Sequence, residues 1–410
     1  MSWVGIAIFV VTYALISARR LSWLGLDRPA GALLGAVCCV VFGVLAPSEA
    51  LSAVNGPTIL LLFGVMGMGA FLALDRFFDD IEHAIVRVAR TPARLLGCVV
   101  WGAGILSAFI TNDAVCVLGA PLVVRLVQRH ELPRLPFLLA LATAANTGSA
   151  GTLVGNPQNM LCAVLGQLSF REHLLIVGPL ALACLAINHG LLWLFFRRQL
   201  GGRSLAHRNA HPPINARTAV TLAVIGGTAV AYTAGADLAW AATAGFVALL
   251  LLHRRDARQL WTRIDWSLLL FFAGLFIVVE GFLRSGGPGW LFDRLPLSGS
   301  GAGGLVGWMR MAGIFLVGSN IVSNVPFILV VRDQMASLSD PALGWELLSV
   351  VSTFAGNLTL LGSVANIIVA ESARDIGGLG FLEYLRVGLP LALITALLGT
   401  VWLVAFFPAG

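Results

Sequence analysis

The chain has 410 residues, of which 58% are hydrophobic and 11% are charged, and its mean hydropathy is +0.90. An ordinary soluble domain is about 25% charged, so this composition argues against a soluble enzyme, a nucleic-acid-binding protein and a disordered chain. The net charge of +6 comes from 26 Arg and no Lys, and in a polytopic membrane protein Arg gathers in cytoplasmic loops.

Long apolar segments predict a bundle of membrane-spanning helices, each of which needs roughly 20 residues. In chain order the predicted spans are 3–17, 29–46, 57–75, 95–110, 135–150, 172–196, 218–234, 238–252, 266–284, 303–320, 344–370 and 384–407. The first segment lacks the flanks of a cleaved signal peptide, so we expect it to be a span. Two shorter apolar pieces, 114–128 and 324–331, each follow a polar break, which predicts re-entrant hairpins.

Arg is unevenly distributed between alternate loops. One set of loops holds 21 of the 26 Arg, and these loops are 18–28, 76–94, 125–134, 197–217, 253–263 and 371–386. The positive-inside rule then places both termini outside the cytoplasmic (inner) membrane. It also makes the first hairpin (95–128) enter from the cytoplasm and the second (303–332) from the opposite side.

Two parts of the sequence repeat. T-L-V-G-N-P-Q-N at 152–159 matches T-L-L-G-S-V-A-N at 359–366 at an offset of 207, and Thr111-Asn112 matches Ser323-Asn324 at an offset of 212. Two oppositely oriented repeats with broken helices are typical of secondary transporters. The predicted fold is therefore an all-α polytopic membrane protein with two inverted-topology repeats, each with a re-entrant hairpin and an unwound helix. Its parts are N-terminal spans (1–50), the first repeat (51–196), a basic cytoplasmic loop with linking spans (197–264) and the second repeat (265–410).

The first break brings together a hydroxyl, an amide and a carboxylate at Thr111, Asn112 and Asp113. Polar groups in mid-membrane are costly unless they have partners, and oxygen ligands of this kind suit a hard cation such as sodium. The alternative for Asn112 is that it only caps a broken helix. Asp113 has no counterpart, because Val325 stands at the equivalent position. A buried carboxylate can carry a proton or stay ionised against a cation; otherwise Asp113 is an N-cap facing water.

The second break is rich in glycine, with Gly148, Gly151 and Gly155 ahead of Pro157. Glycine lets the backbone unwind and approach a ligand, and proline prevents a regular helix. Unwound carbonyls can coordinate a cation while neighbouring amides and hydroxyls bind a substrate. Close helix packing is the alternative reason for the glycines.

These patterns predict a site built from both halves. The candidate substrate contacts are Thr111, Asn112, Asn146, Thr147, Asn159, Ser323, Asn324, Asn357, Thr359 and Asn366. The candidate coupling-ion positions are Asp113, Gly155, Gly362 and Ser363, and a sodium site is predicted at Thr111, Asn112, Asp113 and Gly155. No Arg is expected near either hairpin tip.

Other polar groups in apolar segments have simpler explanations. Glu280 is expected to pair with Arg284 one helical turn away near the outer interface, although a coupling role is the alternative. His189 is expected to be a packing histidine. The six Cys have no metal-ligand spacing. The sequence contains no P-loop and no embedded-hydrolase motif, so we expect neither ATP-driven pumping nor an enzyme.

Four stretches resemble the ion transporter superfamily, which includes anion/sodium symporters, arsenite permeases and sodium/proton antiporters. They are Phe109–Asp113, Gly151–Asn159, Ser323–Pro326 and Ala355–Gly362. The resemblance covers about residues 50–405 and implies inverted repeats, a homodimer and an elevator-like movement. In the dicarboxylate branch both tips read Ser-Asn-Thr, and this chain departs from that at Asp113 and Val325. The first tip is closer to the arsenite permeases, and the second half is closer to bacterial anion permeases.

The hypothesis is thus an ion-coupled secondary transporter of a small anion or oxyanion in a lipid bilayer, with sodium or a proton as the coupling ion and no other cofactor. Proton-coupled arsenite or antimonite efflux and sodium/proton antiport are the alternatives. We expect no nucleic-acid partner.

Overall fold

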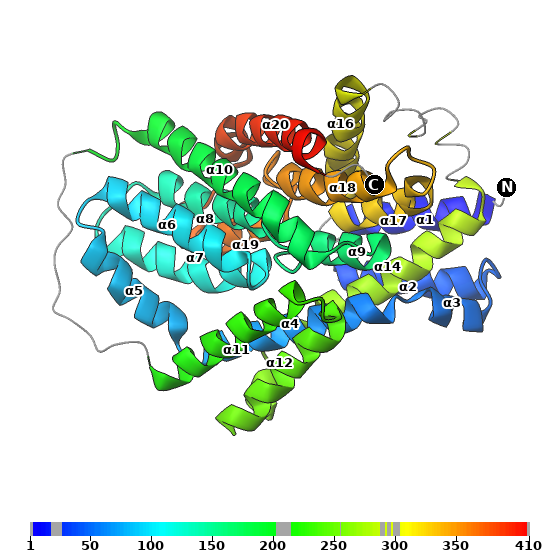
Figure 1. Ribbon diagram of the computed structural model, residues 1–410, viewed down its shortest axis with the longest axis horizontal. Coiled ribbons are helices and arrows are strands. Elements are labelled where there is room, and N and C mark those ends of the chain that lie inside the picture. The colour runs from blue at the N-terminus through cyan, green and yellow to red at the C-terminus, as the bar shows by residue number, and fades with distance from the viewer. Residues whose placement is uncertain are drawn as a thin grey trace.

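The computed structural model describes residues 3–17, 27–201, 215–254, 256–287, 292, 297 and 304–407. All regular secondary structure in these residues is helical (Figure 1). The first half contains α1 (Trp3–Ser17), α2 (Arg28–Val41), α3 (Pro47–Ala53), α4 (Gly56–Leu74), α5 (Phe77–Val88), α6 (Pro92–Ser107), α7 (Asn112–Arg129), α8 (Arg134–Ser149), α9 (Pro157–Gly166) and α10 (Phe170–Phe196). The remainder contains α11 (Ala216–Thr233), α12 (Leu238–His253), α13 (Arg258–Trp261), α14 (Trp266–Arg284), α16 (Leu305–Val322), α17 (Asn324–Met335), α18 (Pro341–Ala355), α19 (Val364–Ser372), the 3₁₀ helix η2 (Arg374–Ile376) and α20 (Phe381–Phe406).

Within the described residues, five helices are long and apolar enough to cross a membrane, namely α4, α10, α14, α16 and α20. Shorter apolar helices include α1, α2, α6 and α12. Each predicted span corresponds to a helix to within a few residues at either end, and the span 344–370 contains the predicted break, which separates α18 from α19. The helices α3, α5, α9 and α13 lie outside the predicted spans. The basic loop 197–217 lies largely outside the described residues, as does most of loop 18–28.

Polar residues start many of these helices in the way that their sequence dictates. Asp27, Asn55, Thr91 and Asp340 each accept a hydrogen bond from a backbone N–H of the first turn, and each stands just before a proline in the first turn. A side-chain cap satisfies an orphan donor, and proline has no N–H to leave unpaired. Local sequence therefore determines where these apolar helices begin.

The helices break at the predicted positions. The α6–α7 pair is interrupted at 108–111, and the α16–α17 pair at Ser323. The α8–α9 and α18–α19 pairs are interrupted at 150–156 and at 356–363. Each interruption exposes helix ends in the middle of an apolar sequence.

The two halves are interleaved. α9 follows the break at 150–156 but packs against α17 and α18, whereas α19 follows the break at 356–363 but packs against α7 and α8 (Figure 1). A separate group is formed by α2, which packs on α1 and α14. α4, α11 and α12 pack side by side as a further group. The interleaving brings all four breaks together.

Small residues allow the closest helix contact in the first half. A Cβ atom added at Gly148 on α8 would lie 2.0 Å from the carbonyl oxygen of Gly104 on α6. Only glycine permits this approach, because neither backbone can move without disturbing its own helix. This contact sets α6, and hence the first tip, directly against the first unwound segment.

Candidate functional site

The chain at the two breaks 108–111 and 323, with the first residues of α7 and α17, forms two tips that face one cavity. Its polar lining side chains are Arg28, Asn112, Asp113, Gln158, Ser323, Asn324 and Ser363. Leu268, Phe271 and Phe272 of α14 form part of its apolar wall. Polar groups that converge in an otherwise apolar enclosure are typical of a small-ligand site.

Four helices begin at this cavity. Its lining includes the first residues of α7 (Asn112), α9 (Pro157), α17 (Asn324) and α19 (Val364). A helix N-terminus carries a partial positive charge and unpaired N–H groups. The converging ends therefore make a positive environment suited to an anion without a charged side chain from the tips themselves.

Hydrogen bonds attach the first tip to the first unwound segment and to α8. The backbone N–H of Asn112 donates to the carbonyl of Gly155 at 2.9 Å, and its amide nitrogen donates to Oδ1 of Asn146 at 2.9 Å. Thr111 caps α7 by accepting from the N–H of Ala114. Oδ1 of Asn112 is buried and accepts no hydrogen bond from the described residues.

The second tip has the same free oxygen on a different backbone. The amide nitrogen of Asn324 donates to the carbonyl of Gly362 at 3.4 Å, and its buried Oδ1 again has no donor among the described residues. Ser323 has φ of 74°, in the region that favours glycine, and makes no side-chain cap for α17. Strain of this kind concentrates at functional sites. Buried polar atoms normally have partners, so both oxygens point to a ligand that donates hydrogen bonds or carries positive charge.

A chain of amides fixes which way Asn112 points. The nitrogen of Asn366 donates to the carbonyls of Gly356 and Thr359, which can only accept. Oδ1 of Asn366 must then accept from the nitrogen of Asn146 at 2.9 Å. Oδ1 of Asn146 is consequently left to accept from Asn112. The free atom of Asn112 is therefore its oxygen, and this assignment follows from backbone carbonyls in the second half.

Hydrogen bonds repeat at the sequence offset of 207. Asn159 donates to the carbonyls of Ser149 and Thr152, and Asn366 donates to those at the matching positions 356 and 359. The amide oxygens of these two asparagines also accept across the halves. Thr353 donates to Asn159 at 2.7 Å, and Asn146, at the position matching Thr353, donates to Asn366.

The predicted site residues separate into two groups. Asn112, Asp113, Ser323, Asn324, Gly362 and Ser363 line the cavity between the tips. Asn146, Thr147, Asn159, Asn357 and Asn366 are buried and bonded to one another or to neighbouring groups behind it. Thr359 donates to Asn320 at 3.4 Å. The second group thus positions the unwound segments, whereas the first can touch a ligand.

Asp113 lies between two cavities. It lines the cavity of the tips and also an adjacent one, whose lining includes Thr111, Arg263 and Asp265. Thr111, Asn112, Asp113 and Gly155 offer only oxygen atoms and backbone groups to a cation. Within the described residues no group of three His, Cys, Asp or Glu is placed to hold a metal ion.

One expectation about charge is wrong. Arg28, the first residue of α2, lines the cavity of the tips. The helix-start signal Asp27-Arg28-Pro29 shows that this side chain stands at the beginning of α2, but the sequence does not show that α2 begins beside the tips. Gln158, next to the predicted Asn159, was likewise not singled out and lines the same cavity.

A buried contact between a histidine and a carboxyl group braces the break at 150–156 and was not predicted from the sequence. Nδ1 of His173 on α10 lies 2.7 Å from Oε2 of Glu346 on α18, and both side chains are inaccessible to solvent. Nε2 of His173 lies 2.9 Å from the carbonyl of Ala150, where α8 ends. The pair ties the unwound segment to the second half.

Glu280 and His189 are explained as expected. Glu280 contacts Arg284 at 2.9 Å and Arg332 of α17 at 2.6 Å. Nδ1 of His189 accepts from the indole of Trp101 at 3.3 Å, and its ring packs against Gly97. Both are therefore satisfied by protein partners.

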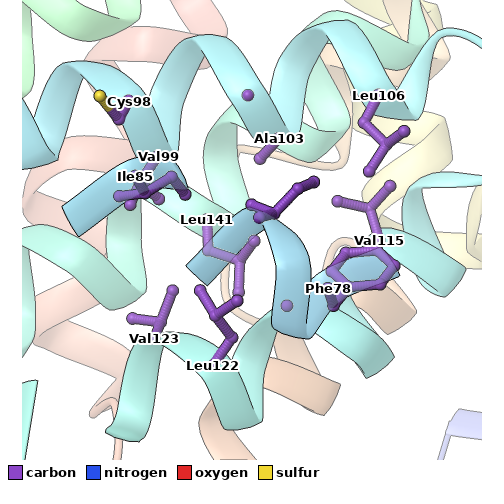
Figure 2. Close-up of a pocket in the computed structure, with 13 residues that line it drawn as sticks. Phe78, Ile85, Cys98, Val99, Ala103, Leu106, Val115, Leu122, Val123 and Leu141 are labelled. Carbon is purple, nitrogen blue, oxygen red and sulfur yellow. The ribbon is translucent and has the colours of Figure 1, made fainter. Parts of the chain in front are cut away.

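A further pocket lies between α5, α6, α7 and α8. Figure 2 shows its labelled residues, among them Phe78, Leu106, Val115 and Leu141, directed into the space. Its lining is apolar throughout, with Cys98 as the most polarisable member. It offers no group to hold a charged solute and is distinct from the cavity of the tips.

Known proteins resemble this chain over nearly its whole length. A family model described as "Citrate transporter" matches residues 12–355. The silicon efflux transporter LSI3 of Oryza sativa subsp. japonica is 31% identical, over 96% of each chain. A Dictyostelium discoideum protein named as a transporter, arsB, is 25% identical over 96% of this chain and 90% of that one. The crystal structure of the YdaH transporter of Alcanivorax borkumensis shares the fold, with a TM-score of 0.53 at 14% identity, over 100% of this chain and 98% of that one.

Proposed function

Because the chain belongs to the citrate transporter family, we propose that it is an ion-coupled secondary transporter that moves a small anion or oxyanion across the cytoplasmic membrane. Its relatives are named as transporters. With its long apolar helices and its family membership, this chain is a helical membrane transporter as well. The observation that carries the anion proposal is the convergence of four helix N-termini on one cavity between the tips.

Two inverted repeats form the framework of this proposal. The equivalent hydrogen bonds of Asn159 and Asn366, and the reciprocal bonds of Thr353 and Asn146, support a twofold relation between the halves. The paired backbone breaks support two re-entrant hairpins and two unwound helices.

An elevator-type movement is the proposed route of alternating access. The tips and unwound segments are tied together by buried hydrogen bonds, while α2 packs on α1 and α14. The cavity lies between these two groups of helices, so sliding one group against the other would carry the site across the membrane. The cavity beside Asp113 includes Arg263, from a loop predicted to be cytoplasmic, which supports an inward-facing state.

Asp113 is the proposed coupling site, for a proton or for sodium. It is the one acidic side chain among those that line the cavity of the tips, and it also borders the neighbouring cavity. Gly155, Thr111 and Asn112 would complete a cation site. Asn112 and Asn324 would contact the substrate, with Ser323 and Ser363 beside them.

Arsenite or antimonite efflux is the second candidate. The free oxygens of Asn112 and Asn324 favour a ligand with hydroxyl donors, such as an undissociated oxyacid. The relatives named for silicon efflux and arsB make this substrate class worth testing directly. Sodium/proton antiport without another substrate is the third candidate and rests on Asp113 alone. We also propose a homodimer with both termini outside, to be tested by cross-linking and by labelling of engineered terminal cysteines.

Flux into proteoliposomes distinguishes these functions. Purified protein is tested with arsenite, phosphate, sulfate, succinate and citrate under separate sodium and proton gradients. Accumulation of an anion under either gradient supports the main proposal. Proton-driven movement of arsenite alone supports efflux, and cation exchange without any added substrate supports antiport.

A further inference from the structure

Arg28 enters the cavity from a group of helices that does not contain the tips. It is the first residue of α2, where Asp27 accepts from the N–H of Ala30 at 3.0 Å and Pro29 follows. These neighbours fix the start of α2. Since α2 packs on α1 and α14, Arg28 is carried by the body against which the tips would move.

The charge of Arg28 affects the charge balance of the cavity, because the side chain is only partly exposed. It is half-buried and shares the cavity with Asn112, Asn324 and the apolar wall of α14. A cation in such an enclosure is costly unless an opposite charge lies near. Among the lining residues of this cavity the one other charged side chain is Asp113.

The two charges give the cavity two states. When Asp113 is ionised and holds no cation, the charges of Arg28 and Asp113 cancel. When Asp113 has bound sodium or a proton, one positive charge remains. Arg263 and Asp265 border Asp113 in the adjacent cavity, are of opposite sign and change this balance little.

We propose that Arg28 selects the charge of the substrate, by binding an oxyanion once Asp113 has taken up its coupling cation. The inference rests on the proposed transport of an anion. A guanidinium has five N–H donors, so it can keep a protein partner and still bind an oxyanion through two hydrogen bonds, as a bidentate ligand. The substrate class is therefore an anion with two oxygens in one plane, such as a carboxylate, sulfate or phosphate.

The test compares Arg28→Gln and Arg28→Lys with the wild type, and uses Arg171→Gln as the control, because Arg171 is exposed and lines neither cavity. KM is measured for labelled citrate, sulfate and phosphate in proteoliposomes under the gradient that drives uptake. Removing a charge-assisted bond should raise KM by roughly 10- to 100-fold in Arg28→Gln. Arg28→Lys keeps the charge and should lose less, and Arg171→Gln should keep the wild-type KM.

The outcomes separate the inference from the proposed function. An unchanged KM in Arg28→Gln, with anion uptake by the wild type, overturns the role of Arg28 and leaves the transporter proposal in place. An equal rise in KM for Arg28→Lys and Arg28→Gln overturns selection by charge. Absence of anion uptake by the wild type overturns the proposed function itself. KM does not depend on how much of a variant is folded, so reduced expression leaves the comparison valid.

Discussion

The two tips share one arrangement of an asparagine side chain and differ in backbone conformation and in charge. Asn112 and Asn324 each anchor an amide nitrogen and leave a buried oxygen free. The first tip adds Asp113, whereas the second has Val325 at that position. The first tip is capped by Thr111, whereas the second begins at a strained Ser323 without a side-chain cap. Each tip thus places an asparagine at the cavity, and only the first tip adds an ionisable side chain to its lining.

The largest expected effect is at the position that distinguishes the tips. Asp113→Asn makes the first tip as uncharged as the second and should reduce gradient-driven uptake to background while the protein stays folded. The physical reason is that an amide can neither bind a proton at neutral pH nor balance a cation. Uptake in proteoliposomes and elution as a single species in detergent are the measurements.

Asp237→Asn is the matched control for this variant. Asp237 is exposed and caps α12 through the N–H of Trp240, a role that asparagine performs equally well. It should transport like the wild type. Full gradient-driven uptake by Asp113→Asn would remove Asp113 from the coupling mechanism.

The next prediction concerns how tightly glycine is packed in each of the two unwound segments. A Cβ atom at Gly155 would lie 2.2 Å from the carbonyl of Ser149, whereas at Gly362 the nearest atoms lie at 3.0 Å. Gly155→Ala should therefore lower the free energy of unfolding by about 3 kcal/mol, and Gly362→Ala by about 1 kcal/mol. Thermal melting in detergent measures both. Gly102→Ala, where no atom lies within 4 Å, is the control. Equal losses at the two positions would mean that the segments are packed alike.

The third effect concerns the polar network behind the cavity. Asn146→Ala removes a partner from Asn112, Asn366 and Ser363 at once and should cost about 2–3 kcal/mol of stability. Thr353→Ala, at the matching position, removes a hydroxyl that contacts Asn159 and Asn156 and should cost about 1 kcal/mol. Melting temperature and KM are measured together. Asn146→Ala should also raise KM, because Asn112 loses the bond that orients its oxygen. A loss of stability with an unchanged KM would show that this orientation is unimportant.

The smallest effect concerns the ion pair between α14 and α17. Glu280 of α14 binds Arg332 of α17, whereas Ala120 stands at the matching position of the first hairpin. Glu280→Gln should cost about 1 kcal/mol or less, since these side chains remain partly exposed. Its contribution should weaken in high salt, which melting with and without added sodium chloride would reveal. A loss above that of Asn146→Ala would contradict this ranking.

Much of the fold follows from local sequence. Apolar length, proline and cap residues locate the long apolar helices, and the repeated motifs locate all four breaks, including the one that divides the predicted span 344–370 into α18 and α19. The exceptions are the shorter helices α3, α5, α9 and α13, which lie outside the predicted spans. Asn112, Asp113, Ser323 and Asn324 were all predicted as site residues and do line one cavity. Their roles in binding and coupling stay predictions until flux is measured.

The sequence by itself determined the class of protein, the approximate positions of the apolar helices, the duplicated breaks and the polar residues at the tips, because these depend on composition and on signals only a few residues apart. Tertiary structure decided the rest. It put α9 against α18 and α19 against α7, so that Asn146, Asn159, Asn357 and Asn366 bond across the halves instead of lining the cavity. It also brought Arg28, 84 positions before Asn112, to the same cavity. No local pattern encodes these contacts, since they arise only when separate helices pack.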